Sequence, residues 1–180
     1  RELVHRKALS ESSTNPTITK IDVLRALKTD EGRLFPAPCL IASIPALVQR
    51  HQEESLIAAI VKAEFTPILI HADGGVGKSV FSTRIGRYLP EGSVCILYDC
   101  FGNGQYRSAS AFRHRHKDAL VQIANEMAGL GLCHPLIPTP NADATAYLRA
   151  FKYRIKQAVD SIHAKTPTAL LCIIVDAADN

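Results

Sequence analysis

PILIHADGGVGKSVFSTRIGRYL, at residues 67–89, predicts the fold more strongly than any other part of the chain. Residues 67–71 form an apolar run that predicts a strand, and residues 80–89 predict a helix. Between them lies the glycine-rich segment ADGGVGKS, residues 72–79. A strand, a glycine-rich loop and a helix in this order are typical of a loop that binds the phosphates of a nucleotide.

The residue types of this loop suit the chemistry of a triphosphate. Gly74, Gly75 and Gly77 carry no side chains, so backbone N–H groups can curl around a phosphate. The start of the following helix favours anions, because its first N–H groups have no partners within the helix. Lys78 can reach the β- and γ-phosphates, and the Ser79 hydroxyl can ligate Mg²⁺.

One position departs from the common pattern G-x-x-x-x-G-K-[ST], which has glycine where this chain has Ala72. An alanine is tolerated there if its backbone has negative φ. The alternative interpretation is a chance glycine-rich turn before a helix, and the flanking elements count against it. The residues predicted to contact the nucleotide are Gly74, Gly75, Val76, Gly77, Lys78, Ser79 and Val80.

A second motif closes the sequence, ALLCIIVDAADN at residues 169–180. Its unbroken apolar run predicts a strand buried on both faces, as in a parallel sheet. Acids at the carboxyl end of such a strand lie where open α/β sheets bind ligands. Asp176 is therefore a candidate Mg²⁺ ligand beside Ser79, and Asp179 a candidate for activating the attacking water. The alternative is that both acids begin a solvated turn.

Composition indicates a soluble globular domain located in the cytoplasm by default. The chain has 180 residues, 47% hydrophobic content and a net charge of only +4, too small an excess to indicate nucleic-acid or membrane binding. No apolar run reaches the ~18 residues that a membrane span needs, and no secretory signal is visible. The five cysteines lack C-x-x-C spacing, which favours reduced thiols over disulfides or zinc ligands.

Outside the two motifs, further patterns predict helices and one more strand. The predicted helices cover residues 19–28, 46–63, about 120–128 and 144–162, and the predicted strand covers 94–98. Because the sequence starts without Met and stops at the second motif, we expect further strands and helices beyond it.

Arg113 to Lys117 form a basic cluster that we interpret as the solvated start of a helix, with contact to phosphate as the alternative.

Three blocks in this order carry a family resemblance: ILIHADGGVGKS, ILYDCFGNGQYR and LLCIIVDAADN. Together they resemble the STAND class of signal-transduction P-loop ATPases, and most of all its NACHT-like bacterial members, among them those of antiviral defence. The spacing of Asp176 and Asp179 is similar to the NACHT-like acids, whereas AAA ATPases place the second acid where this chain has Ala177. Ala178 and Asn180 depart from the commonest NACHT ending.

The resemblance implies an α/β fold, a three-layer sandwich with a mostly parallel sheet, that follows a short helical linker. Residues 1–33 would be the linker and residues 34–180 the ATPase core, which would be truncated at its C-terminal side. Such a core binds ATP and Mg²⁺, hydrolyses ATP slowly with Lys78 and the second acid, and switches a larger protein into a homo-oligomer when an activating ligand arrives. Arg50 loosely matches an arginine that packs near the nucleotide base.

Two other functions remain open on the residues alone. A P-loop kinase would transfer the phosphoryl group to a small molecule, although no arginine-rich lid is evident. A nucleotide-bound scaffold would bind without turnover. Neither the base of the nucleotide, ATP or GTP, nor the activating ligand has a motif of its own in this sequence.

Overall fold

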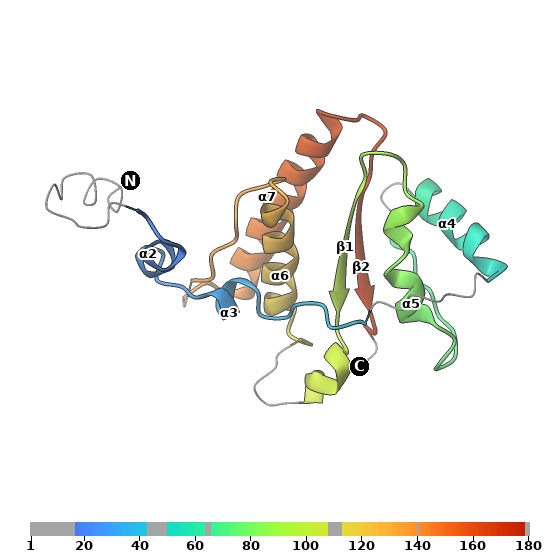
Figure 1. Ribbon diagram of the computed structural model, residues 1–180, viewed down its shortest axis with the longest axis horizontal. Coiled ribbons are helices and arrows are strands. Elements are labelled where there is room, and N and C mark those ends of the chain that lie inside the picture. The colour runs from blue at the N-terminus through green and yellow to red at the C-terminus, as the bar shows by residue number, and fades with distance from the viewer. Residues whose placement is uncertain (1–16, 43–49, 64–65, 108–112, 140, 179–180) are drawn as a thin grey trace, which may run out of the picture.

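The computed structural model describes residues 17–42, 50–63, 66–107, 113–139 and 141–178, and it combines helices with a small parallel sheet (Figure 1). Its elements, in chain order, are α2 (Lys20–Ala26), α3 (Glu31–Leu34), α4 (Gln52–Lys62), α5 (Lys78–Ser82), the 3₁₀ turn η1 (Ile85–Arg87), β1 (Val94–Asp99), η2 (Gly102–Arg107), α6 (His116–Gly129), α7 (Ala144–His163) and β2 (Leu171–Asp176).

The two strands β1 and β2 lie side by side and run parallel. Their register starts with Val94 opposite Leu171 and ends with Asp99 opposite Asp176. The chain passes between them through α6 and α7, the long crossover that a parallel connection requires. Both strands were predicted from their apolar runs, and their parallel pairing confirms the α/β class. Within the described residues the sheet has these two strands only.

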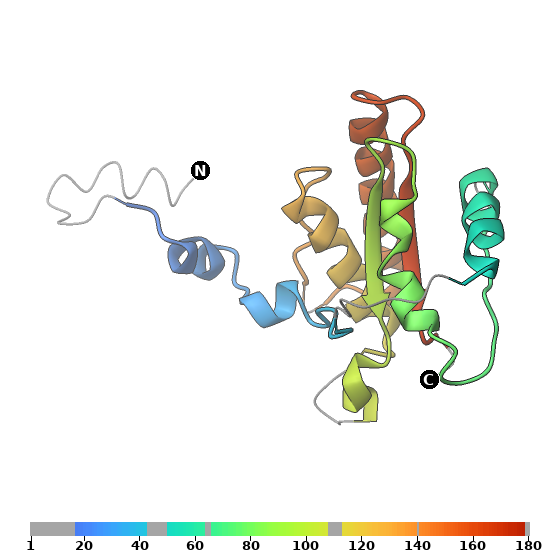
Figure 2. The ribbon, with the colours of Figure 1, turned by 45° about the vertical axis from the view of Figure 1, so that its right-hand side comes forward.

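Helices lie on both sides of the strand pair (Figures 1 and 2). On one side α6 and α7 form the main core with the inward residues of β1, and on the other side α5 and η1 approach the strands. Burial of these apolar side chains is the main favourable contribution to folding. The most deeply buried members of the core are Ala37, Ile96, Tyr98, Val121, Ala124, Met127, Tyr147, Ala158, Ile162 and Ala169.

The helices that carry this core follow their sequence patterns. In α7 the side chain of Asp143 accepts a hydrogen bond from the Ala146 N–H at 2.7 Å and so caps the helix. In α2, Thr19 forms a reciprocal capping box with Asp22. The predictions of helices at residues 19–28 and 144–162 are thus confirmed, with the ends shifted by a residue or two.

The predicted strand at residues 67–71 is wrong. The segment has no regular structure, and its apolar side chains reach solvent, with Ile68 39% and Leu69 92% exposed. A strand needs a neighbour whose backbone it can pair with, and within the described chain none pairs with this segment. The composition of this segment is therefore typical of a strand, but the described chain offers it no partner strand.

The predicted helix at residues 80–89 is interrupted. The helix α5 ends at Ser82, and a 3₁₀ turn follows it. The hydroxyl of Ser82 donates to the Lys78 carbonyl, and that of Thr83 donates to the Val80 carbonyl at 2.7 Å. Such side-chain bonds compete with the helical backbone and help to end it. The predicted helix at 46–63 begins at Gln52 in α4, and its residues up to 49 lie outside the described part of the chain.

Candidate nucleotide-binding site

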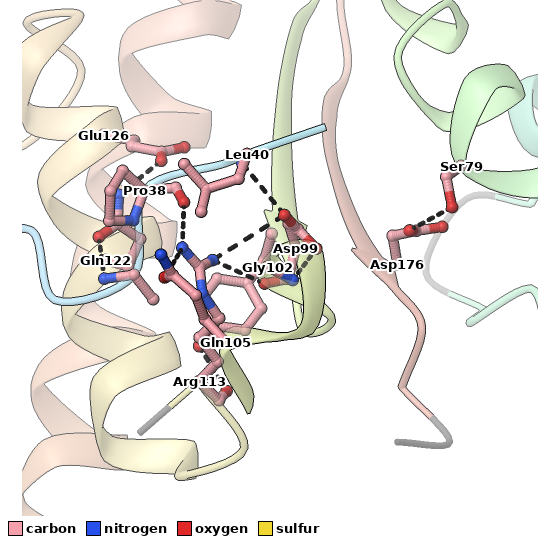
Figure 3. A network of polar contacts seen from close by, with 12 residues as sticks. Pro38, Leu40, Ser79, Asp99, Gly102, Gln105, Arg113, Gln122, Glu126 and Asp176 are labelled. Atoms are coloured by element: carbon pink, nitrogen blue, oxygen red, sulfur yellow. Dashed lines mark hydrogen bonds and ion pairs between the residues drawn. The ribbon is translucent and has the colours of Figure 1, made fainter. Parts of the chain in front are cut away.

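A hydrogen bond joins the glycine-rich loop to the end of the sheet. The Ser79 hydroxyl in α5 donates to Oδ2 of Asp176 in β2 at 2.7 Å, across 97 positions of sequence (Figure 3). The hydroxyl of Ser82, one turn further along α5, donates to Oδ1 of the same carboxylate at 3.4 Å. Asp176 is buried, with 7% of its surface exposed. The two residues predicted to share a metal ion are therefore in direct contact.

Backbone conformation explains two of the three loop glycines. Gly75 has φ of 76°, and Gly77, which precedes α5, has φ of 92°. These values lie in the left-handed region that L side chains rarely adopt. At Gly74, Gly75 and Gly77 an added Cβ would meet no atom within 4 Å. At Gly74 neither the backbone conformation nor a neighbouring atom requires glycine. A ligand that lies close against the backbone there would require it.

The loop lysine folds back across its own loop. The Lys78 ammonium donates to the Ala72 carbonyl at 2.6 Å and to the Asp73 carbonyl at 3.0 Å. Both of these residues are exposed, so the positive charge lies at the open side of the loop. Phosphate oxygens are stronger acceptors for an ammonium than neutral carbonyls are. Ala72 does not have a positive φ, so its departure from the glycine pattern causes no strain.

A second buried carboxylate lies at the end of the neighbouring strand. Asp99 of β1 is 1% exposed, and its oxygens accept from the N–H groups of Gly102 at 2.8 Å and Leu40 at 3.0 Å (Figure 3). Between the two strand ends, the Cys100 N–H donates to the Asp176 carbonyl at 3.1 Å. Burial raises the pKa of the Cys100 thiol, and the negative charges of Asp99 and Asp176 raise it further.

Arg113 compensates the charge of Asp99. Its guanidinium lies 3.9 Å from Oδ2 of Asp99, donates to the Asp99 carbonyl at 3.0 Å and donates to the Pro38 carbonyl at 2.7 Å. It is 3% exposed, so its interpretation as part of a solvated helix start is wrong. The arginine is buried because its donors find acceptors on three segments of chain, at Asp99, Pro38 and Gln105. The sequence signal that could have indicated this cluster is an acid, Asp99, at the same strand position as Asp176.

The remaining predicted site residues are placed as follows. Val76 and Val80 are half-buried beside the loop. Arg50 is exposed just before α4, and among the described residues no hydrogen bond or ion pair joins it to the loop. The contact from α4 instead involves Glu53, which is buried against Arg84 at 3.1 Å. Asp179 lies outside the described residues.

The donor set suits one hard cation that is shared with a ligand. The part of the chain that the structure describes holds no group of three or more His, Cys, Asp and Glu side chains able to bind a metal. Ser79 and Asp176 offer a hydroxyl and a carboxylate, oxygen ligands that Mg²⁺ accepts alongside waters and phosphate oxygens. Lys78 could therefore hold a phosphate, and Ser79 and Asp176 could hold a magnesium ion beside it.

The comparisons with known proteins identify no family for this chain. No family model matches the chain, and no curated protein matches it. Across the described helices, none is long and apolar enough to cross a membrane.

Proposed function

We propose that this chain is the nucleotide-binding part of a regulatory ATPase, which binds ATP with Mg²⁺ at residues 74–80 and hydrolyses it slowly. The observation that carries the proposal is the 2.7 Å hydrogen bond from Ser79 to Asp176. It joins the residue after the loop lysine to an acid at the carboxyl end of a parallel strand, the edge at which α/β sheets bind ligands.

Each residue has a separate role in this site. Lys78 exchanges the carbonyls of Ala72 and Asp73 for β- and γ-phosphate oxygens when a triphosphate binds. Ser79 and Asp176 would hold Mg²⁺, because their oxygens already converge. When bound, the ion neutralises charge on the phosphates. The Asp176 carboxylate, which accepts a hydrogen bond from the Ser79 hydroxyl, would be a ligand of the ion.

Hydrolysis and switching complete the proposal. Asp179 would accept a proton from the attacking water, as its place three residues after Asp176 in the sequence suggests. The coupling of nucleotide state to homo-oligomer formation rests on the resemblance of the three sequence blocks to NACHT-like STAND proteins. A three-layer sandwich with a mostly parallel sheet and a cytoplasmic location belong to the same proposal.

Phosphate release from ATP by the full-length protein tests this function. We expect Mg²⁺-dependent release without any acceptor molecule, and a large loss of release in Ser79→Ala. Thr83→Ala is the matched control, because it removes a hydroxyl from the same stretch that bonds only to the Val80 carbonyl. Phosphoryl transfer that requires an added acceptor would indicate a kinase instead. Tight ATP binding without release would indicate a scaffold, and no binding at all would overturn the proposal.

A further inference from the structure

Two cysteines face each other across the strand pair. Cys95 of β1 and Cys172 of β2 are register partners, each the second residue of its strand. Neighbouring strands lie about 4.8 Å apart, and partners in a parallel pair project to the same face of the sheet. That spacing lies within the roughly 4.4–6.8 Å between Cα atoms over which disulfides form. The register thus places the two cysteines at a backbone spacing over which a disulfide can form.

The two thiols are partly exposed, and their pKa values shift in opposite directions. Both side chains are half-buried. Gly86 of η1 packs closely over Cys95, since an added Cβ on this glycine would come within 3.1 Å of the Cys95 Cβ. The hydrogen bond that the Cys95 thiol makes to Cys172 raises the pKa of Cys95, and burial raises it further. Accepting that bond lowers the pKa of Cys172, although burial opposes the effect, so Cys172 is the thiol of the pair that ionises more readily.

The pair is separate from the candidate nucleotide site. Three residues along each strand lie between these cysteines and the carboxylates of Asp99 and Asp176, a separation of about 13 Å over four steps at the usual rise of a strand. Elsewhere in the described chain the cysteines lack such a partner. Cys133 bonds the Ala124 carbonyl through its thiol, and Cys39 is exposed.

We propose that Cys95 and Cys172 form a reversible redox site, which low-molecular-weight disulfides of the glutathione type oxidise to a cross-strand disulfide. The Cys172 thiolate attacks one sulfur of the small disulfide and expels the first small thiolate. Cys95 then loses its proton, attacks the Cys172 sulfur of the mixed disulfide and expels the second. Two protein thiols are oxidised, the small disulfide is reduced to two thiols, and the electrons and protons balance.

Peptide mapping of the full-length protein tests this site. Reduced protein is equilibrated in buffers of increasing oxidised-to-reduced glutathione ratio, alkylated and digested with trypsin. Cleavage after Arg87, Arg107 and Lys165 releases a peptide of residues 88–107 and another that begins at residue 166. We expect these two peptides to appear linked, with a mass two hydrogens below their sum, and to separate again in dithiothreitol.

Variants identify the cysteines involved, because the peptide 88–107 also contains Cys100. Cys100→Ser and Cys133→Ser should leave the linkage unchanged. Cys95→Ser should abolish it and leave Cys172 carrying glutathione. The proposal is overturned if the link persists in Cys95→Ser, if it is lost in Cys100→Ser, or if Cys95 and Cys172 stay fully alkylated in buffers that already place glutathione on the exposed Cys39.

Discussion

At the scale of single residues, the ammonium of Lys78 holds the loop carbonyls of Ala72 and Asp73 in the structure described here. Lys78→Ala should weaken ATP binding by about 10- to 100-fold, because a charged hydrogen bond to phosphate contributes roughly 1.5–3 kcal/mol. Isothermal titration calorimetry with ATP and Mg²⁺ measures the change. Lys152→Ala, an exposed lysine on α7, is the control and should bind like the wild type. Equal affinity in Lys78→Ala would refute the loop assignment.

Gly102 is the glycine on which the buried Arg113 depends. An added Cβ there would lie 2.0 Å from the Arg113 Nε, and the backbone has φ of 53°. We expect Gly102→Ala to lower the free energy of unfolding by about 2–4 kcal/mol, since the clash and the strain act together. Urea unfolding should show a smaller loss, about 1 kcal/mol, for Gly104→Ala, which has positive φ but open space.

Gly129 completes that comparison. It ends α6 without positive φ and with no atom near an added Cβ, so Gly129→Ala should be neutral or slightly stabilising. If the three variants were equally stable, the close packing of Arg113 against Gly102 would be refuted.

At the scale of the elements, sequence patterns predicted the helices and strands that local chemistry determines. They missed the features that depend on residues distant in the sequence. Hydrophobic patterns predicted β1, β2 and α7 correctly. The apolar runs indicate the two buried strands, and the spacing of apolar residues in α7 indicates a helix. The run at 67–71 has the same character, yet it is not a strand, since a strand also needs a partner. Arg113 looked solvated because its acceptors, Pro38 and Asp99, are far away in sequence.

The Ser79–Asp176 contact, in contrast, was predictable. Each residue belongs to a motif whose place on an element was evident, and the carboxyl edge of a parallel sheet brings such positions together. The Asp99 cluster had a weaker signal, an acid at the end of its strand, and the register of β1 and β2 is what places that acid opposite Asp176.

The longest helix allows a test of its own. Asp143 caps α7 through the Ala146 N–H, so Asp143→Ala should lower the free energy of unfolding by about 1 kcal/mol. Asp160 lies on the same helix and pairs with Lys156 at the surface, and Asp160→Ala should cost less than about 0.5 kcal/mol. Chemical denaturation of both variants measures the difference. A cost for Asp160→Ala at least as large as for Asp143→Ala would contradict the capping role.

At the scale of the whole molecule, α6, α7 and β1 form a packed core, and the loop with α5 meets β2 from the other side (Figure 2). The two carboxylates at the strand ends have different partners. Asp99 is neutralised by Arg113, whereas Asp176 accepts only hydroxyls from α5 among the described side chains. The charge of Asp176 is therefore the one that a cation can use, and the proposed site depends on it.

The most direct test of that dependence is the affinity of the full-length protein for ATP as a function of Mg²⁺ concentration, in wild type and in Asp176→Asn. The amide keeps the shape and an acceptor for Ser79 but removes the charge. We predict that Mg²⁺ tightens ATP binding strongly in the wild type and little in Asp176→Asn, with Asp160→Asn behaving as wild type. An unchanged Mg²⁺ dependence in Asp176→Asn, or no ATP binding by the wild type, would contradict the account.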